Sequence, residues 1–444
     1  MRNRKISLIS LGCPKNLVDS EGIVSDLMTN SAEIVVDPAE ADVVVVNTCG
    51  FLGSAREESL NTIREAAKLK KSGLKALFVT GCMVGNYRDQ LIEAVPEVDR
   101  LIDFADYGRI NEYVNEYLPA AELATPGFVT PGRYVQARLT PAHFSYLKIG
   151  EGCNHTCSFC VIPKIRGRLK SIPMEELVNR ARRLGQMGTK EINVVAQDTT
   201  MYGVDLYGRF RITELLQNLD KIDELSWIRL LYAYPTEVTE DLADLLASGS
   251  RVLPYIDVPL QHSSNHMLEL MRRKTREDDV ELMIDRLRSR GRDMTIRTTM
   301  IVGFPGETDA DFEHLMSFAE RHQFDRLGAF TYSPEEGSQA FDLPGHVPEE
   351  VKEERLGRLM TLQQQISKSR NQRFVDQDID VLIEDPGEGT ETAIGRSKAD
   401  APEIDGKVFV RGKDLKSGDI VQVKINRAEA YDLHGRVSGD QQTC

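Results

Sequence analysis

Three cysteines with a short spacing are the most chemically informative residues of the chain. Cys153, Cys157 and Cys160 stand in the run Gly-Glu-Gly-Cys-Asn-His-Thr-Cys-Ser-Phe-Cys, residues 150–160. This Cys-x3-Cys-x2-Cys loop brings three soft thiolate ligands to one metal centre. A cubane iron-sulfur cluster normally takes four cysteines, so a set of three leaves one iron free to bind a reacting molecule. The spacing therefore predicts a catalytic 4Fe-4S cluster.

Zinc is the alternative occupant of this loop. A Cys3His set is a known zinc site, and His155 lies inside the loop. His155 is, however, too close in sequence to its neighbouring cysteines to fold back readily onto the same ion, and no second Cys-x2-Cys pair follows. The iron-sulfur interpretation is therefore favoured over zinc.

Length, charge and cysteine usage limit the class of protein. A chain of 444 residues suggests roughly three domains. Seven cysteines without a dense even pattern, and no charged-then-apolar leader, indicate a reducing cytoplasm rather than secretion. The longest aliphatic runs, such as residues 43–46, have the length of a strand, so no membrane span is expected. The formal charge of −14 argues against general phosphate binding without a local basic patch.

The overall prediction is an α/β protein, and its first domain, residues 1–118, is expected to be a doubly wound parallel sheet. Short apolar runs at 6–11, 42–46 and 75–79 are typical of strands, and helical stretches such as 54–71 lie between them. Alternating strands and helices of this kind favour a parallel sheet covered by helices.

Each of these three strands runs into a cysteine. The three are Cys13, Cys49 and Cys82. Because the carboxyl ends of parallel strands share the edge where ligands bind, we expect the three thiols to meet there and to form a second metal site. Burial as a small apolar side chain is the commoner fate of a lone cysteine. A cysteine at each of three successive strand ends, however, favours a metal site.

A proline-rich stretch over residues 119–142 is predicted to be a linker. The second domain is predicted over residues 143–374, where strands alternate with helices such as 174–187 and 276–290. Its six expected strands are 146–149, 191–196, 227–232, 255–260, 295–302 and 326–332. Six such units predict a partial (βα)6 barrel. The cysteine loop directly follows the first strand, at the face where parallel barrels carry their chemistry.

Polar residues and glycines follow other strands of this predicted barrel. Asp198 comes after the second strand, and Gly303, Gly306 and Glu307 come after the fifth. Glycine lets a nucleoside approach the backbone closely, although Gly-x-Pro-Gly is also an ordinary turn. A group of basic residues follows the cysteine loop. These cations either offset the charge of the iron-sulfur cluster or hold a carboxylate, or they simply belong to a solvated loop. The members of this basic cluster are Lys164, Arg166, Arg168 and Lys170.

The last part of the chain changes its pattern. A long helix is expected over 349–374, and residues 375–444 are predicted to form a small antiparallel β-barrel. The expected strands are 379–384, 392–395, 407–410, 420–426 and 431–437. This barrel has nine Lys and Arg against fifteen Asp and Glu, a formal charge of −6. A module that grips RNA is expected to be basic, so a basic protein is the better match.

These segments resemble known families. The cysteine loop and residues 301–308 are similar to radical S-adenosylmethionine (SAM) enzymes, and residues 375–444 resemble the TRAM domain. The three parts in this order resemble the methylthiotransferases over essentially the whole chain. The match is closest to the branch that modifies an aspartate of ribosomal protein S12. It rests on residues 10–21, 47–51, 153–163, 197–203 and 401–406.

The resemblance implies two 4Fe-4S clusters and SAM as cofactors. An aliphatic C–H bond offers no acidic proton, and acid-base groups contribute only about 10²- to 10⁴-fold in rate, so a cofactor must do the hard step. The resemblance implies that Cys153, Cys157 and Cys160 bind a cluster that passes an electron to SAM. The resulting radical is then expected to remove a hydrogen atom from the β-carbon of the aspartate. The resemblance assigns Cys13, Cys49 and Cys82 to a cluster that holds sulfur. The expected SAM contacts are Asp198, Gly303, Gly306 and Glu307.

The implied partners are ribosomal protein S12, an electron donor and a sulfur donor, with a monomeric cytoplasmic enzyme and no membrane. Asp400, Glu403 and Asp405 are expected to assist association with the basic substrate. Three alternatives stay open. One is the sister branch, which shares the six cysteines and modifies isopentenyladenosine in tRNA. The others are a protein with structural metal sites and a radical SAM enzyme whose first three cysteines transfer no sulfur. Cys444 lies outside the pattern.

Overall fold

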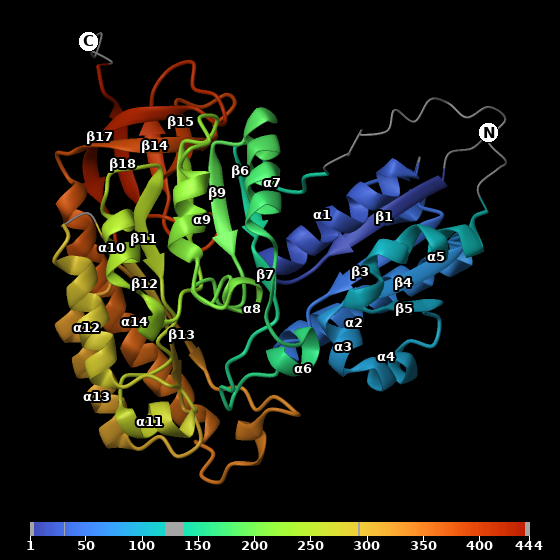
Figure 1. The fold of residues 1–444 in the computed structure, drawn as a ribbon, viewed down its shortest axis with the longest axis horizontal. Coiled ribbons are helices and arrows are strands. Elements are labelled where there is room, and N and C mark those ends of the chain that lie inside the picture. The colour runs from blue at the N-terminus through green and yellow to red at the C-terminus, as the bar shows by residue number, and fades with distance from the viewer. Residues whose placement is uncertain (1–3, 31, 120–136, 292–293, 440–444) are drawn as a thin grey trace. The chain divides into compact units, whose positions relative to one another are not determined.

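The computed structural model describes residues 4–30, 32–119, 137–291 and 294–439. Most of the predicted linker, together with Cys444, lies outside these residues. The chain forms two compact units (Figure 1). The first comprises the residues up to Leu139 with Gly152–Asn154 and Cys160–Arg168, and the second comprises Thr140–Glu151, His155–Phe159 and the chain from Leu169 onward. No helix in the described part of the chain is long and apolar enough to cross a membrane.

The first unit is built on a five-stranded parallel sheet, in the order β2-β1-β3-β4-β5. Its strands are β1 Arg4–Ser10, β2 Ala32–Ile34, β3 Val43–Thr48, β4 Ala76–Gly81 and β5 Arg100–Ile102. All residues of β3 and β4 are buried, because apolar side chains pack on both faces of the sheet under helices. The three predicted strands are confirmed. The sequence analysis missed β2 and β5, whose three residues each carry too little periodicity to be recognised.

The described residues of the first unit form six helices. They are α1 Pro14–Thr29, α2 Gly53–Lys68, α3 Cys82–Asn86, α4 Arg88–Ala94, α5 Ile110–Tyr117 and α6 Ile162–Arg166. Helix α6 comes from a later part of the sequence than the other five, and it lies beside α3 (Figure 1). The predicted helix over 54–71 is confirmed, although its last turn tightens into a 3-10 helix over Leu69–Ser72.

The second unit contains a six-stranded parallel sheet, in the order β13-β12-β11-β10-β9-β6. Its strands are β6 Phe144–Lys148, β9 Glu191–Val195, β10 Trp227–Leu230, β11 Val252–Asp257, β12 Thr295–Val302 and β13 Arg326–Thr331. All six strand predictions are confirmed, with ends that differ by a few residues. The two short strands β7 Gly150–Glu151 and β8 Lys170–Ser171 pair antiparallel across the base of the cysteine loop.

Helices cover the outside of this sheet. They are α7 Met174–Gln186, α8 Val204–Tyr207, α9 Ile212–Leu219, α10 Glu240–Leu246, α11 Asn265–Leu270, α12 Glu277–Arg288, α13 Asp309–His322 and α14 Glu349–Asn371. In α7, Leu177, Ala181 and Leu184 are spaced to share one helix face, and all three are buried in the core. The predicted long helix over 349–374 ends three residues early, where Gln372–Phe374 forms a 3-10 turn.

The carboxyl-terminal barrel is closed and five-stranded, in the order β14-β15-β16-β18-β17. Its strands are β14 Asp378–Asp385, β15 Thr392–Ser397, β16 Val408–Arg411, β17 Ile420–Ala428 and β18 Leu433–Val437. The prediction of an antiparallel barrel is wrong for one pair, since β16 and β18 are parallel. Neighbouring strands alternate in direction in a wholly antiparallel ring, and an odd number of strands cannot satisfy that alternation around a closed ring.

Buried ion pairs join this barrel to the six-stranded sheet inside the second unit. The Glu191 carboxylate, in β9, accepts from Arg229 Nε at 2.8 Å and from Arg396 Nη2 at 2.6 Å. Arg396 also donates to Glu384 at 2.7 Å. Glu191 and Arg229 are completely buried, so these charges depend on one another for stabilisation.

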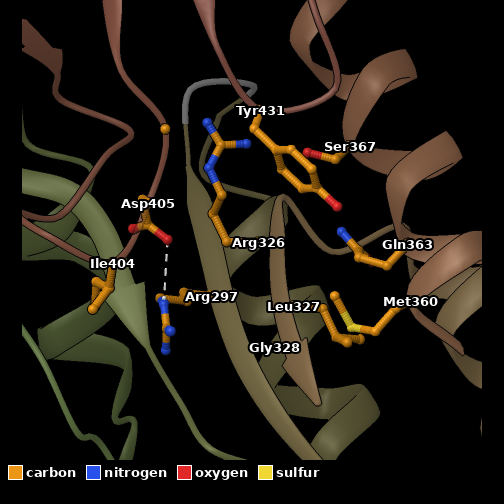
Figure 2. A pocket seen from close by; sticks show the side chains of 11 residues that line it. Arg297, Arg326, Leu327, Gly328, Met360, Gln363, Ser367, Ile404, Asp405 and Tyr431 are labelled. Atoms are coloured by element: carbon orange, nitrogen blue, oxygen red, sulfur yellow. Dashed lines mark hydrogen bonds and ion pairs between the residues drawn. The ribbon is translucent and has the colours of Figure 1, made fainter. Parts of the chain in front are cut away.

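The acidic residues expected to meet the substrate are mostly part of this junction. Asp400 accepts from Arg326 at 2.7 Å, and Asp405 accepts from Tyr255 at 2.6 Å. Figure 2 shows Asp405 directed at Arg297, where the separation is 3.3 Å. The side chains of Asp400 and Asp405 are each only 2 % exposed, so the expectation of a substrate-facing role is wrong for them. Only Glu403 is exposed, and its carboxylate accepts from Tyr146 at 3.3 Å.

A cavity of about 290 Å³ lies at the same junction (Figure 2). Its lining includes Arg297 and Arg326, which stand near the amino-terminal ends of β12 and β13, together with Gln363 of α14 and Tyr431. The predicted cofactor residues follow the carboxyl ends of the strands instead. This cavity therefore lies away from the edge where chemistry is expected.

Replacing Glu191 tests the energetic importance of the buried junction. Removal of one partner leaves buried charges uncompensated and typically costs about 3–5 kcal/mol, so Glu191→Gln should strongly reduce the free energy of unfolding measured with urea at pH 7. Burial alone would raise the pKa of the Glu191 carboxyl, but Arg396 and Arg229 outweigh it and hold the pKa below its usual value. The stabilisation is therefore fully present at pH values above the pKa of Glu191 in the unfolded chain. It is lost as the pH falls through the lower pKa that Glu191 has in the folded protein.

The matched control is Glu214→Gln. Glu214 pairs with Arg211 at the surface, with a side chain that is 41 % exposed, and solvent screens such a pair. This variant should unfold close to the wild type, and its difference from wild type should remain small across the pH range. Equal losses for the two variants would contradict the proposed importance of the junction.

Candidate metal centres

Cys13, Cys49 and Cys82 meet at one edge of the first unit. They follow the carboxyl ends of β1, β3 and β4, which pair in parallel. A Cβ atom added to Gly12 would lie 2.9 Å from Cβ of Cys49, and one added to Gly50 would lie 2.8 Å from the carbonyl carbon of Cys82. Glycine beside the cysteines therefore lets the three strand ends come into contact. Gly12 also has a φ of +89°, which favours glycine.

Asn16 fixes the geometry of this edge. Its Nδ2 donates to the backbone oxygens of Leu11 at 3.0 Å and of Thr48 at 2.8 Å, and so ties the ends of β1 and β3 together. Its Oδ1 accepts from Cys82 Sγ at 3.7 Å and from Arg166. One side chain on the first turn of α1 therefore contacts all three segments of the site. The sequence analysis missed Asn16, although its spacing of three residues from Cys13 at the start of a helix was an available signal.

Burial and a nearby cation set the pKa values of the three thiols. Burial raises the pKa of Cys82 to about 11, against the charge and the side-chain hydrogen bond of Arg166. Burial also raises the pKa of Cys49. Burial alone would raise the pKa of Cys13, but the charge of Lys15, a backbone N–H and the charge of Arg166 together lower it. Ligation by sulfur requires thiolates, so metal binding at this edge is coupled to the release of protons.

The cysteine loop is divided between the two units. Cys153 and Cys160 belong to the first unit and Cys157 to the second. The backbone N–H of Cys153 donates to the Gly167 oxygen at 3.1 Å, and Cys160 Sγ accepts from the Ile162 N–H at 3.4 Å. Cys157 Sγ accepts from Arg273 Nη1 at 3.9 Å. Donors to sulfur stabilise the thiolate form that metal ligation requires.

His155 has partners within the second unit. Its Nε2 lies 2.6 Å from Asp198 Oδ2, and its ring stacks on Tyr234 with centroids 4.0 Å apart. Asp198 is fixed in turn by Thr200, whose N–H and hydroxyl donate to it at 2.9 and 2.6 Å. The Arg273 guanidinium lies 4.3 Å from the centroid of the same Tyr234 ring. The sequence indicated Asp198 only by its position after a strand, and it gave no signal for Arg273.

The segment after β12 is fixed by its own contacts. The Glu307 side chain is completely buried, with Arg355 at 3.1 Å and His262 at 3.5 Å, and it accepts from the N–H of Gly303. The N–H of Gly306 donates to the Gly345 oxygen at 2.9 Å. These contacts give Glu307 a role in holding the turn. Binding of SAM by Asp198, Gly303, Gly306 and Glu307 stays a prediction.

The structure separates the predicted basic cluster. Arg166 is buried beside Cys82 in the first unit, whereas Lys164, Arg168 and Lys170 are exposed. Within the described ranges, no group of three or more Cys, His, Asp or Glu side chains is arranged to hold a single metal ion. The six cysteines with described positions are all free thiols.

Comparisons with known families define the class of the protein. The Radical SAM superfamily matches residues 147–319, the TRAM domain matches residues 375–437, and Uncharacterized protein family UPF0004 matches residues 5–103. The radical SAM methyltransferase TsrM from Kitasatospora setae has a TM-score of 0.55 over 76 % of this chain and 75 % of its own, at 15 % identity. That likeness shows the fold alone. The chain is a radical SAM enzyme with a carboxyl-terminal TRAM domain.

Its sequence relatives identify the family. Proteins named ribosomal protein uS12 methylthiotransferase RimO are 44 % identical in Clostridioides difficile, over 98 % of both chains, and 45 % identical in Aquifex aeolicus, over 97 % of both. The one from Geobacter sulfurreducens is 43 % identical over 98 % of both chains. The chain belongs to the RimO family of radical SAM methylthiotransferases, which implies one 4Fe-4S cluster and SAM as cofactors.

Replacing Gly12 tests the close approach of the strand ends. Gly12→Ala should lower the melting temperature of the protein for two reasons. A left-handed backbone costs a non-glycine residue about 1–2 kcal/mol, and the collision with Cys49 adds an overpacking cost of about 1–3 kcal/mol. Gly73→Ala is the matched control, because Gly73 has a φ of +107° but nothing within 4 Å of an added Cβ. Equal melting temperatures for the two variants would contradict the contact.

Proposed function

We propose that this enzyme adds a methylthio group to the β-carbon of an aspartate of ribosomal protein uS12. The observation that carries the proposal is the meeting of Cys13, Cys49 and Cys82 at one sheet edge, in a chain that also has the three-cysteine loop of a radical SAM domain. One triad serves the radical chemistry. A sulfur transfer needs a second site that holds sulfur, and the first unit has the thiols for it.

The first unit fits a cluster bound by three thiolates. The glycines beside Cys13 and Cys49 pack closely against Cys49 and Cys82, and the buried Arg166 offers a positive charge and a hydrogen bond to Cys82. We assign Cys13, Cys49 and Cys82 to a second 4Fe-4S cluster, and Cys153, Cys157 and Cys160 to the cluster that binds SAM. When bound, these groups supply the one-electron chemistry and the sulfur that functionalisation of an aliphatic C–H bond requires.

The residues around the loop have supporting roles in this proposal. Arg273 donates to Cys157, and the Tyr234 ring contacts both the ring of His155 and the guanidinium of Arg273. Asp198 orients His155 through a 2.6 Å contact. These contacts hold the middle of the cysteine loop in one conformation, as a positioned reaction requires.

The choice of substrate rests on the relatives and on charge. The relatives reported above carry the ribosomal-protein name, so the tRNA alternative is not favoured. Exposed acidic residues occur at several places on the TRAM domain, and three of them, Asp385, Glu388 and Glu391, stand close together at the carboxyl end of β14 and in the turn that follows. Complementary charge raises the rate of encounter with a basic protein and disfavours a polyphosphate.

The proposal includes an electron donor and a sulfur donor as further partners. One chain carries both cysteine triads, so the proposal requires no second copy, and we propose a monomer. A ribosomal-protein substrate and six free thiols fit action in the cytoplasm.

Iron content tests the assignment of two clusters. Anaerobically reconstituted protein should contain about eight irons per chain, as two cubanes require. Replacement of Cys13, Cys49 and Cys82 together by Ala should halve this number, and so should replacement of Cys153, Cys157 and Cys160. Wild-type protein that holds only half the expected iron after full reconstitution would rule out the second cluster.

The same variants separate the two halves of the reaction. Cys49→Ala should still cleave SAM in the presence of dithionite but form no methylthiolated product, because its radical SAM triad is intact. Cys157→Ala should do neither. Loss of SAM cleavage in Cys49→Ala, with the other cluster present, would contradict this division.

Charge reversal tests the substrate. Asp385→Lys, Glu388→Lys and Glu391→Lys in one protein should slow association with ribosomal protein uS12, most clearly at low ionic strength, where screening is weakest. SAM cleavage without substrate should be unchanged. The control reverses three exposed acids of α14, Glu350, Glu353 and Glu354, in the same unit but outside the TRAM domain.

Binding and turnover should be measured with uS12 and with tRNA that contains isopentenyladenosine, at two ionic strengths. Methylthiolation of uS12 alone, slowed only by the TRAM variant, is the expected result. Methylthiolation of the tRNA but not of uS12 would overturn the substrate assignment.

A further inference from the structure

Arg166 is a buried cation at the site of the first three cysteines. It stands at the last position of α6, six residues after Cys160, in the segment Cys160–Arg168 of the first unit. Its side chain is 1 % exposed. Its Nη1 donates to Asp19 Oδ2 at 3.0 Å, its Nη2 donates to Asn16 Oδ1, and its side chain also donates to Cys82.

Apolar packing fixes the direction of this side chain. Val161 and Ile165, on the same segment, are buried in one cluster with Cys82, against Phe51 and Phe104. The guanidinium of Arg166 lies 4.4 Å from the centroid of the Phe104 ring. The arginine therefore cannot turn away to solvent without dismantling the packing around Cys82.

The charge balance at this position favours a negatively charged occupant. A buried ion pair usually gains little over an apolar pair, because desolvation of both charges offsets their attraction. A guanidinium is always charged, and it forms an ion pair with Asp19, whose side chain is 5 % exposed. Three thiolates and the cluster they bind add negative charge on the Cys82 side of the guanidinium. That charge explains a cation at this depth better than the pair with Asp19 does alone.

We propose that Arg166 is a positioning residue of the second cluster, which stabilises the cluster's reduced state through its buried charge and its hydrogen bond to Cys82. This inference rests on the proposed function. Net charge and hydrogen bonds to sulfur set the reduction potential of an iron-sulfur cluster. A fixed positive charge favours the state with one more electron, so removal of Arg166 shifts the potential to more negative values.

The segment that carries Arg166 also carries Cys160. Cys160 binds the first cluster in the proposed function, and Arg166 serves the second, within one run of seven residues. Displacement of α6 therefore acts on both centres. Arg166 belongs to the predicted basic cluster that follows the cysteine loop in the sequence, and its contacts with Asp19, Asn16 and Cys82 lie in the first unit.

The test is a redox titration of the second cluster, in which electron paramagnetic resonance measures how much of the cluster is reduced. The background is the full chain with Cys153, Cys157 and Cys160 replaced by Ala, which leaves one cluster. Arg166→Gln should lower the ratio of reduced to oxidised cluster at a fixed potential at least tenfold, which corresponds to about 59 mV for a one-electron couple. Arg166→Lys should keep most of the wild-type potential. Arg168→Gln, which removes an exposed cation from the same segment, should leave the potential unchanged.

Asp19→Asn distinguishes an electrostatic role from a merely structural one. It removes the carboxylate that balances Arg166, so the potential should shift in the opposite direction, to more positive values. Structural damage would move both variants the same way. Shifts of the same sign, or no shift in either variant, would overturn the inference. If Arg166→Gln does not fold, the sign of the Asp19→Asn shift decides alone. A background protein that binds no iron would instead overturn the proposed second cluster.

Discussion

The close approach of three parallel strand ends is the constraint on which the amino-terminal site depends. β1, β3 and β4 deliver Cys13, Cys49 and Cys82 to one edge only because a glycine stands next to a cysteine at the contacts. Any Cβ at Gly12 or Gly50 would occupy space that another cysteine's residue already fills. The buried polar atoms at these strand ends then need partners, and Asn16 supplies them for β1 and β3. The sheet, the glycines and Asn16 thus form one arrangement that positions thiols.

The second unit is held together by a different interaction. Its TRAM barrel is joined to the parallel sheet through buried charges, with Glu191 at the centre and Asp400 and Asp405 around it. Such a junction gives orientation rather than a large net stability, because desolvation consumes most of the attraction between the charges. A fixed orientation suits a module that presents a substrate to a reaction centre. Exposed acidic residues that take no part in this junction include those of the turn after β14.

Sequence analysis predicted the strands well and the site unevenly, for physical reasons. Strands such as β3 and β12 are recognisable because burial demands continuous or alternating apolar residues, whereas β2 and β5 are too short to show a pattern. The cysteines are recognisable by spacing alone. Asn16 and Arg273 act through contacts with residues that are distant in sequence, and such contacts leave no periodic signal. Asp400 and Asp405 were misread because a carboxylate is usually exposed, and their arginine partners are distant in sequence.

The position of Arg166 shows how one short segment can contribute to both proposed metal sites. The chain leaves the second unit after Phe159, contributes Cys160–Arg168 to the first unit, and returns at Leu169. The β7–β8 pair closes the base of this excursion, and burial of Val161 and Ile165 fixes its far end against Cys82. A loop with only metal ligands would need no such anchor. The excursion thus carries, within one short segment, a ligand of one proposed cluster and a buried cation proposed to serve the other.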